Sequence, residues 1–380
     1  MKVLLTLASA SVTGPAERVM GDARALLAAG HEVSVAHDTV RPGNFGERLM
    51  AAGIPREAGL ALCPKPTPAQ LARDLFRLRA ALRAGRFDLV HAHFSHDHQL
   101  AILAALGLRR RPRIVRAAET ERQLEPTIAR RQSYRRSDGL EVATRERAAR
   151  LVQRFGLAPE RVEALAGAVD AERFRPAPPG APSPLRQRLG IGAEVPLVGI
   201  VARIKAERRH TELLAAFARL APDFPAARLA IVGRGEGEPA LRAEALRLGI
   251  ERRVHFAGYW AGPELVQAYQ GLDVAVWLAE GNDGSCRGVL EAMAVGLPMV
   301  AGDAGASAEL VQGGASGLLV PPGDVPALTV ALGRLLAAPG ERRAFGDAGR
   351  RRAQEHYSWE RRGEALVDFY ARLEALPAVS

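Results

Sequence analysis

Short apolar runs alternate with stretches of helical periodicity along the first half of the chain. The apolar runs lie at residues 3–7, 32–36, 89–93 and 114–117, and helical patterns cover residues 16–29 and 69–84. This alternation is typical of a parallel sheet built from βα units. We therefore predict a Rossmann-like, doubly wound domain over residues 1–172.

A second series of the same kind occupies the other half. Strand-like runs lie at residues 197–201, 229–232, 254–256, 274–278 and 299–301, with helical patterns at 212–220, 239–248 and 263–269. The sequence thus predicts a second Rossmann-like domain over residues 195–355. The fold class is α/β, with two doubly wound domains and a ligand cleft between them at the carboxyl ends of the strands.

Two further segments complete the predicted organisation. Five prolines fall between Pro176 and Pro184, which predicts an extended, semi-rigid linker over residues 173–194. Residues 356–380 hold a last helix, from about Trp359 to Leu373, with apolar residues at helical spacing.

The net charge of +10 is carried almost entirely by arginine, since the chain has only three lysines. Arginines gather at residues 109–116 and 130–136, in a pattern that fits an anionic lipid, an acidic glycan or nucleic acid. No aromatic residues interleave with them as stacking platforms, which argues against nucleic acid. We expect a peripheral contact with an anionic membrane; the alternative is a merely solvated face.

Cysteine content and hydropathy indicate the compartment. Cys63 and Cys286 fit neither a disulfide framework nor a zinc site, and no apolar run approaches the roughly 20 residues that cross a bilayer. The first residues, MKVLLTLASAS, resemble a short secretory leader but serve equally well as a first strand. We expect a cytoplasmic protein, peripheral at the inner face of the cell membrane if the basic surface binds lipid.

The segment EGNDGSCRGVLEAMAVGLPMVA, residues 280–301, carries the most chemical information. A glycine-punctuated loop runs into a helix and then, through Gly296 to Pro298, into a buried strand. Glycines allow a ligand to approach the backbone, and a helix N-terminus attracts anions. Asp283 and Glu291 lie eight residues apart across the loop-to-helix junction. The combination suits a nucleotide-sugar.

This segment resembles the donor-site signature of retaining glycosyltransferases of family 4, also called group 1, which have the GT-B fold. In that fold a C-terminal helix crosses back onto the first domain, and the resemblance implies that residues 356–380 pack on the N-terminal domain in the same way. The signature reads E-G-F-G-x-x-x-x-E-A-M-A-x-G-x-P-V-V, and Asp283 and Glu291 match its two carboxylates. Asp283 is one methylene shorter than the usual Glu, and Ser285-Cys286 replace Phe-Gly, which bears on sugar selectivity. The resemblance implies that Glu291 holds the ribose hydroxyls. Asp283 would orient the donor sugar with the amides of Gly284, Ser285 and Cys286, and Arg287 and Gly288 would lie at the same site.

The segment VARIKAERRH, residues 201–210, resembles the family's G-R-L-x-x-x-K-G, whose Arg and Lys hold the donor diphosphate. Arg203 matches the Arg, Arg208 stands in place of the Lys, and Arg209 replaces the Gly. Arginine keeps the charge and can bind phosphate bidentately. A solvated basic turn is the alternative.

Three further segments resemble the family near the nucleotide. In LAIVGRGEGEPAL, residues 229–241, Gly233 would lie beside the nucleotide, although a tight turn alone also explains these glycines. In RVHFAGYW, Tyr259 or Trp260 would stack on the base, with core packing the expected role of at least one. In TGPAERV, Gly14 would be the close-approach glycine of the first loop, stiffened by Pro15.

The histidines near residue 93 concern a metal or the acceptor, and Glu119 concerns the transferred sugar. His91, His93, His96 and His98 raise a metal hypothesis, but the resemblance implies no metal and no other cofactor, and we place His93 in the acceptor cleft. Glu119 stands where the family has a histidine facing the transferred sugar. It would bind or deprotonate a sugar hydroxyl, or cap a helix.

The sequence therefore predicts an enzyme that moves a hexose from a nucleotide-diphosphate-sugar to a glycan, a lipid-linked or a small-molecule acceptor, with retention. Arg203, Arg208 and the N-terminus of the 288–295 helix would stabilise the leaving diphosphate. Bacterial surface polysaccharide or glycoconjugate synthesis is the expected context. The alternatives are a non-catalytic nucleotide-sugar-binding subunit and, with so few lysines for a pyridoxal cofactor, a less favoured phosphorylase or an epimerase.

Overall fold

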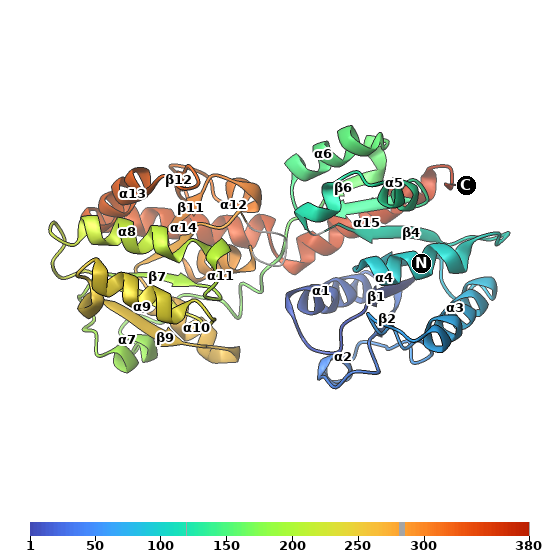
Figure 1. Ribbon diagram of the computed structural model, residues 1–380, viewed down its shortest axis with the longest axis horizontal. Coiled ribbons are helices and arrows are strands. Elements are labelled where there is room, and N and C mark those ends of the chain that lie inside the picture. Colours follow the sequence, from blue (N-terminus) through green and yellow to red (C-terminus); the bar gives the residue numbers. More distant parts are fainter. Residues whose placement is uncertain (119, 281–285, 380) are drawn as a thin grey trace. The chain divides into compact units, whose positions relative to one another are not determined.

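The computed structural model describes residues 1–118, 120–280 and 286–379, and the chain divides into two compact units. Unit 1 comprises residues 1–167 together with the C-terminal segment from Trp359, and unit 2 comprises the chain from Ala168 to Ser358. Each unit is built on a parallel sheet with helices on both faces (Figure 1). No helix in the described ranges has both the length and the apolar character that crossing a bilayer requires.

The sheet of unit 1 has the strand order β2-β1-β3-β4-β5-β6. Its strands are β1 (Lys2–Leu7), β2 (Glu32–His37), β3 (Leu89–Ala92), β4 (Arg113–Ala117), β5 (Gly139–Val142) and β6 (Val162–Ala164). Its helices are α1 (Gly14–Ala28), α2 (Phe45–Ala51), α3 (Pro68–Arg83), α4 (Ser95–Ala105), α5 (Ile128–Arg135), α6 (Arg145–Phe155) and α15 (Trp359–Ala375). Because strand side chains alternate, Val3 and Leu5 of β1 pack with α1 and α15, whereas Leu4 packs with α3 and α4.

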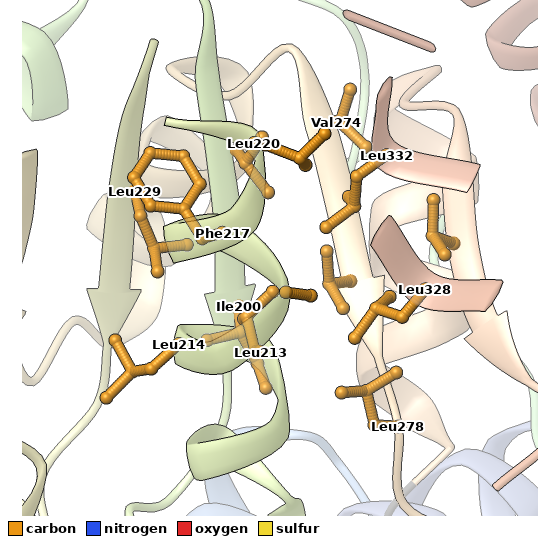
Figure 2. Packing of buried hydrophobic residues seen from close by; sticks show 14 of the residues in the cluster. Ile200, Leu213, Leu214, Phe217, Leu220, Leu229, Val274, Leu278, Leu328 and Leu332 are labelled. Atoms are coloured by element: carbon orange, nitrogen blue, oxygen red, sulfur yellow. The ribbon is translucent and has the colours of Figure 1, made fainter. Parts of the chain in front are cut away.

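The sheet of unit 2 has the order β12-β11-β10-β7-β8-β9. Its strands are β7 (Leu197–Val201), β8 (Arg228–Val232), β9 (Val254–Gly258), β10 (Val274–Trp277), β11 (Met299–Gly302) and β12 (Gly317–Val320). Its helices are α7 (Pro184–Leu189), α8 (His210–Leu220), α9 (Glu238–Arg247), α10 (Gly262–Gln270), α11 (Arg287–Val295), α12 (Gly305–Leu310), α13 (Val325–Ala337) and α14 (Pro339–His356). Figure 2 shows Leu213 and Phe217 of α8 and Leu332 of α13 packed on Ile200, Leu229 and Val274 of the sheet.

Each sheet has a point where the strand order reverses. In unit 2 the chain winds from β7 outward through β8 to β9, then returns to form β10 on the other side of β7. In unit 1 the reversal lies between β1 and β3. Loops at the carboxyl ends of the two strands that flank such a switch point diverge and leave room for a ligand.

The predicted strands and helices are present, but the structure adds elements that the apolar pattern did not indicate. Strands β5, β6 and β12 were not predicted, and β5 carries a buried glutamate, Glu141, where an apolar residue is expected. Residues 173–194, predicted as an extended linker, lie within unit 2 and contain helix α7. The prediction that residues 173–194 are extended throughout was therefore wrong. Pro184 takes the first position of α7, where proline is favoured, and the side chain of Ser183 caps it.

Helix α15 packs closely against α1 in unit 1. Gly21 of α1 leaves the space that the Trp359 ring occupies, and a side chain at Gly363 would collide with Ala25. Leu366, Phe369, Tyr370 and Leu373 of α15 are fully buried. Small residues at both contact points thus let the C-terminal helix join the core of a domain formed by the start of the chain.

A buried network of charges fixes α15 in this position. The Arg362 guanidinium donates to both carboxylate oxygens of Asp22 in α1, at 2.6 and 3.1 Å, and to Glu141 Oε1 in β5 at 2.7 Å. Arg18 also donates to Glu141. Burial alone would raise the pKa of Glu141, but Arg18 and Arg362 hold it well below its usual value. The network therefore consists of charged groups that compensate one another inside the protein.

We expect Arg362→Ala to destabilise unit 1 by about 3–5 kcal/mol, because it leaves Asp22 and Glu141 buried without their shared partner. Urea unfolding followed by circular dichroism measures the effect as a shift in the unfolding transition that occurs at the lower urea concentration. Arg361→Ala is the matched control, since Arg361 is 62% exposed and pairs with Glu364 on the same helix. It should change stability by less than about 1 kcal/mol. Equal effects of the two substitutions would contradict this role for the network.

Candidate functional site

The candidate site in unit 2 is formed at the switch point between β7 and β10. A loop with a short 3-10 turn, Ala206–Arg208, follows β7, and helix α11 begins at Arg287 after β10. Arg203 and Arg208 come from the first loop, whereas Cys286, Arg287 and Gly288 form the start of the helix. Sequence segments about 80 residues apart therefore converge on one edge of the sheet because their strands are neighbours.

The glycine-rich loop after β8 lies directly on the loop after β7. Backbone amides join them, with Ala202 N donating to Val232 O at 3.0 Å and Ile204 N to Arg234 O at 3.1 Å. A side chain at Gly233, whose φ is 147°, would collide with the Ala202 carbonyl, and one at Gly235 would collide with that of Ile204. These glycines are therefore required by backbone packing, whether or not Gly233 also lies beside a nucleotide.

Arg209 adopts a conformation that favours glycine. Its φ of 59° and ψ of 33° lie in the left-handed region, which costs a residue with a Cβ about 1–2 kcal/mol. An ion pair of 2.8 Å between Arg209 Nη1 and Glu212 Oε1 offsets part of this cost. A glycine, as in the motif that this segment resembles, would adopt this conformation without strain, and the conformation fixes the direction in which α8 leaves the loop.

Arg208 is held against the ring of Trp277, the last residue of β10. Its Cζ atom lies 5.0 Å from the ring centroid, and the ring is 95% buried. Burial lowers the pKa of Arg208, Glu207 and the Cys286 thiol act in the opposite direction, and Arg203 lowers it again. Among the described residues, the buried Nε of Arg208 has no hydrogen-bond partner. Arg208 is therefore a partly buried cation that lies near a second cation, Arg203, and one of its N–H donors is not used by the described residues.

Trp277 also contacts the beginning of α11. A Cβ at Gly288 would lie 3.0 Å from the Trp277 ring and 3.3 Å from the Tyr269 hydroxyl, so the glycine lets the helix approach both rings. Arg208, Trp277 and the first turn of α11 thus form one continuous stack. Since helix N-termini carry a partial positive charge, the stack adds to the cationic character of the site.

Glu291 lies one turn further into α11 and is buried. Its Oε1 lies 2.9 Å from Arg287 Nε, and its Oε2 accepts a hydrogen bond of 3.0 Å from the Tyr269 hydroxyl. Burial raises the pKa of Glu291 despite the opposing effects of Arg287, Tyr269 and Arg173. Both carboxylate oxygens are therefore positioned within the protein, and a ligand would share them with these partners.

The two aromatic residues after β9 have different environments. Trp260 is buried and donates its Nε1–H to Ala257 O at 3.0 Å, which is a core role. Tyr259 is 60% exposed, with the Arg234 Cζ 4.7 Å from its ring centroid. Tyr259 is therefore the one of the pair available for the predicted stacking on a base.

Two predicted residues flank the switch point of unit 1. Gly14 is the first residue of α1, after β1, and His93 follows β3. His93 is buried, and its Nδ1–H donates a hydrogen bond of 3.1 Å to the Thr6 carbonyl. Burial and the neighbouring His91 lower the pKa of His93 well below its usual value, so its imidazole is neutral at pH 7.

The remaining site predictions concern residues that the structure does not describe. Glu119, Asp283, Gly284 and Ser285 lie outside the described ranges, so their predicted roles stay predictions. The described residues include no group of three or more His, Cys, Asp or Glu side chains placed to hold a metal ion. Instead, His91 and His93 stack on each other, and His98 Nε2 lies 2.7 Å from the Ser137 hydroxyl.

Sequence reasoning missed Trp277 and Tyr269. Each has a local signal, since a tryptophan at the end of an otherwise aliphatic strand is unusual, and Tyr269 ends a helical pattern immediately before that strand. Their contacts with Arg208 and Glu291 bridge 69 and 22 residues of sequence, and only the fold reveals them.

Comparison with known families identifies the class of protein. The family described as "Glycosyl transferases group 1" matches residues 183–352, and "Glycosyltransferase Family 4" matches residues 13–173. The chain is 31% identical to a D-inositol 3-phosphate glycosyltransferase of Saccharomonospora viridis, covering 78% of this chain and 72% of that protein. This protein belongs to the group 1, or family 4, glycosyltransferases.

Individual relatives and solved structures agree with this assignment. The chain is 31% identical to a GDP-mannose-dependent alpha-(1-6)-phosphatidylinositol monomannoside mannosyltransferase of Mycolicibacterium smegmatis, over 88% of both chains. The fold of this protein is similar to that of Anabaena HepE solved in complex with UDP-glucose. The TM-score is 0.79 at 21% identity, and the match covers 99% of this chain and 100% of the HepE chain. A glycosyltransferase from Rickettsia africae has a TM-score of 0.84 at 14% identity, covering 99% of each chain. The predicted GT-B fold class is confirmed.

We expect Trp277→Leu to weaken binding of a nucleoside diphosphate about 10-fold, because Arg208 loses the ring that positions it. Trp277→Phe keeps a ring face and should lose less than about 3-fold. Calorimetry with UDP and GDP, beside uridine and guanosine, measures the effect, which should be confined to the diphosphates. Trp260→Phe is the control, since that buried ring faces Arg188 instead. Unchanged diphosphate affinity in Trp277→Leu would exclude the positioning role.

Proposed function

We propose that this glycosyltransferase transfers a hexose from a nucleotide-diphosphate-sugar to a glycan, lipid-linked or small-molecule acceptor, with retention of configuration. The observation that carries the proposal is the confined cation Arg208, stacked on Trp277 beside Arg203 and the start of α11. A diphosphate leaving group is the anion that such a site suits. Relatives whose names specify GDP-mannose and a neighbour solved with UDP-glucose support this donor class.

The proposed chemistry relies on charge stabilisation. As the glycosyl–phosphate bond breaks, negative charge grows on the leaving diphosphate while the sugar carbon becomes oxocarbenium-like. Arg203, Arg208 and the amides at the start of α11 would neutralise that charge without a metal or another cofactor. Asp283 and the amides of residues 284–286 would orient the sugar, Glu119 would face the transferred sugar, and His93 would lie in the acceptor cleft. Retention follows from the family, and the bound geometry directs attack to the same face.

The acceptor is the least specified part of the proposal. The names of the relatives specify phosphatidylinositol monomannoside and D-inositol 3-phosphate. These acceptors share a hydroxyl-rich ring, and one of them is a lipid. We infer an acceptor of that chemistry in bacterial glycoconjugate or surface polysaccharide synthesis, at the inner face of the cell membrane.

A non-catalytic subunit that binds nucleotide-sugar is the second candidate. It is favoured by the departures from the family pattern at Asp283, Ser285 and Glu119, which all concern the sugar. Release of nucleoside diphosphate from UDP- and GDP-sugars, with and without acceptors, separates the two. A subunit of this kind would bind the nucleotide without turnover.

We expect Arg208→Ala to reduce turnover by about 10²–10³-fold, because the leaving diphosphate loses a preorganised donor. Arg208→Lys keeps the charge that the family has at this position and should retain activity within about 10-fold. Arg219→Ala, on the exposed side of α8, is the control for a general effect of losing an arginine. Near-normal turnover in Arg208→Ala would refute the diphosphate assignment.

We expect Glu291→Gln to weaken nucleoside diphosphate binding about 10-fold, since a charged acceptor for the ribose hydroxyls is lost. The amide still accepts the Tyr269 hydrogen bond, so the melting temperature should change little. Tyr269→Phe is the control, because it leaves the carboxylate and its Arg287 partner in place and removes only the hydrogen bond from the tyrosine hydroxyl. Lower stability with unchanged affinity in Glu291→Gln would show that Glu291 only supports α11.

A further inference from the structure

We propose that the outer face of helix α3 in unit 1 is a docking surface for an anionic lipid bilayer. This inference goes beyond the proposed transfer reaction and does not depend on it. Helix α3 lies on the outside of unit 1 (Figure 1). Its outward residues are defined by exposure and by three- or four-residue spacing, and comprise Ala69, Ala72, Arg73, Phe76, Arg77, Ala80 and Arg83.

The apolar part of this face centres on Phe76. Its side chain is 76% exposed, in a protein whose aromatic residues are otherwise largely buried, and the alanines at positions 69, 72 and 80 leave it projecting. A hollow of about 350 Å³ adjoins Phe76, and its lining combines apolar residues such as Leu60 and Phe87 with Arg77 and the ion pair of Glu57 with Arg86. An exposed aromatic side chain beside an apolar surface costs free energy in water and gains it in a lipid interface.

The polar part of the face is entirely cationic. The structure describes every residue of α3, and the only acid among them, Asp74, is buried and accepts hydrogen bonds from Ala61 N and Leu62 N, both at 3.0 Å. Arg73 and Arg83 are exposed on either side of Phe76 along the helix. Arginines can extend their apolar stems along the face while their guanidinium groups reach lipid phosphates.

Residues at the end of α4 and just after it continue this apolar and cationic surface. Arg79 donates to the carbonyl oxygens of Ala104 and Leu106, at 3.0 and 2.6 Å, which joins α3 to the end of α4. Leu103 and Leu106 are about half exposed there, and Arg109 and Arg110 follow. Arg110 pairs with Asp88 at 3.4 Å and Arg77 donates to the Gly59 carbonyl at 2.9 Å, whereas Arg73 and Arg83 are exposed on either side of Phe76. This combination of projecting apolar side chains and exposed cations matches an anionic bilayer better than a neutral protein face.

The arginines that sequence reasoning assigned to a membrane are largely used within unit 1. Arg111 and Arg113 form ion pairs with the buried Asp138, at 2.6 and 3.0 Å, and Arg116 is 99% buried. The second cluster, on α5, has the exposed Ile128 but lies beside acids, since Glu121 pairs with Arg147 and Arg150. These pairs leave α3 as the more favourable contact.

The test is co-sedimentation of the full chain with vesicles of phosphatidylcholine alone or with 30% phosphatidylglycerol, without donor or acceptor. We expect binding that requires the anionic lipid and weakens with salt. Arg73→Gln and Arg83→Gln should each lower the partition coefficient about five-fold, and Phe76→Ser about 10-fold. Failure of transfer assays leaves this result unaffected, so the two proposals can fail separately.

A matched variant in the same unit, Ile128→Ser with Arg130→Gln and Arg131→Gln, changes the rival α5 surface. Loss of vesicle binding in this variant but not in the α3 variants would overturn the proposal, as would absence of binding to anionic vesicles at low salt. Concentration-dependent association in the absence of lipid, lost in Phe76→Ser, would instead indicate a protein interface. Phe76→Trp should show quenching by brominated acyl chains, which reports insertion directly.

Discussion

The candidate site depends on one interaction, the stacking of the Arg208 guanidinium on the Trp277 ring at the switch point of the unit 2 sheet. Removing a cation from water is unfavourable, and burial lowers the pKa of Arg208 accordingly. The ring face recovers part of that cost, and an anion in contact with the remaining donors would recover more. A partly buried arginine near a second cation would therefore favour a bound anion over a neutral group, which is the basis of the proposed diphosphate site.

The fold explains why the cations lie at this position. In a parallel sheet all strands end at the same edge, so loops from distant parts of the sequence meet where the winding reverses. The loop after β7 supplies arginines, and the segment after β10 supplies Trp277 and the start of α11. The glycines after β8 allow a third loop to pack on the first. The geometry of the site follows from strand order, and its chemistry follows from a few side chains at strand ends.

Much of this arrangement could be predicted from sequence because its signals are local. Apolar runs located most strands, and the resemblance of residues 201–210 and 280–301 to the family's donor-site motifs pointed to Arg203, Arg208 and Glu291. The missed elements depend on distant partners. Strand β5 carries Glu141, which is stable inside the protein only because Arg18 and Arg362 reach it from 123 residues earlier and 221 residues later in the chain. Arg209 shows the same limit, since its left-handed backbone conformation is visible only in the structure.

The path of the chain between the units has a structural consequence. The chain leaves unit 1 near Gly167 and returns near Trp359, and within unit 2 the segments next to these crossings are paired, with Val169 N donating to Tyr357 O at 2.8 Å and a bridge between Val169 and Ser358. Because Arg362 joins α15 to α1 and β5, the segment that follows Ser358 is held in unit 1 by the same buried ion network. That network therefore joins the two parts of the unit 1 sequence, which unit 2 separates along the chain.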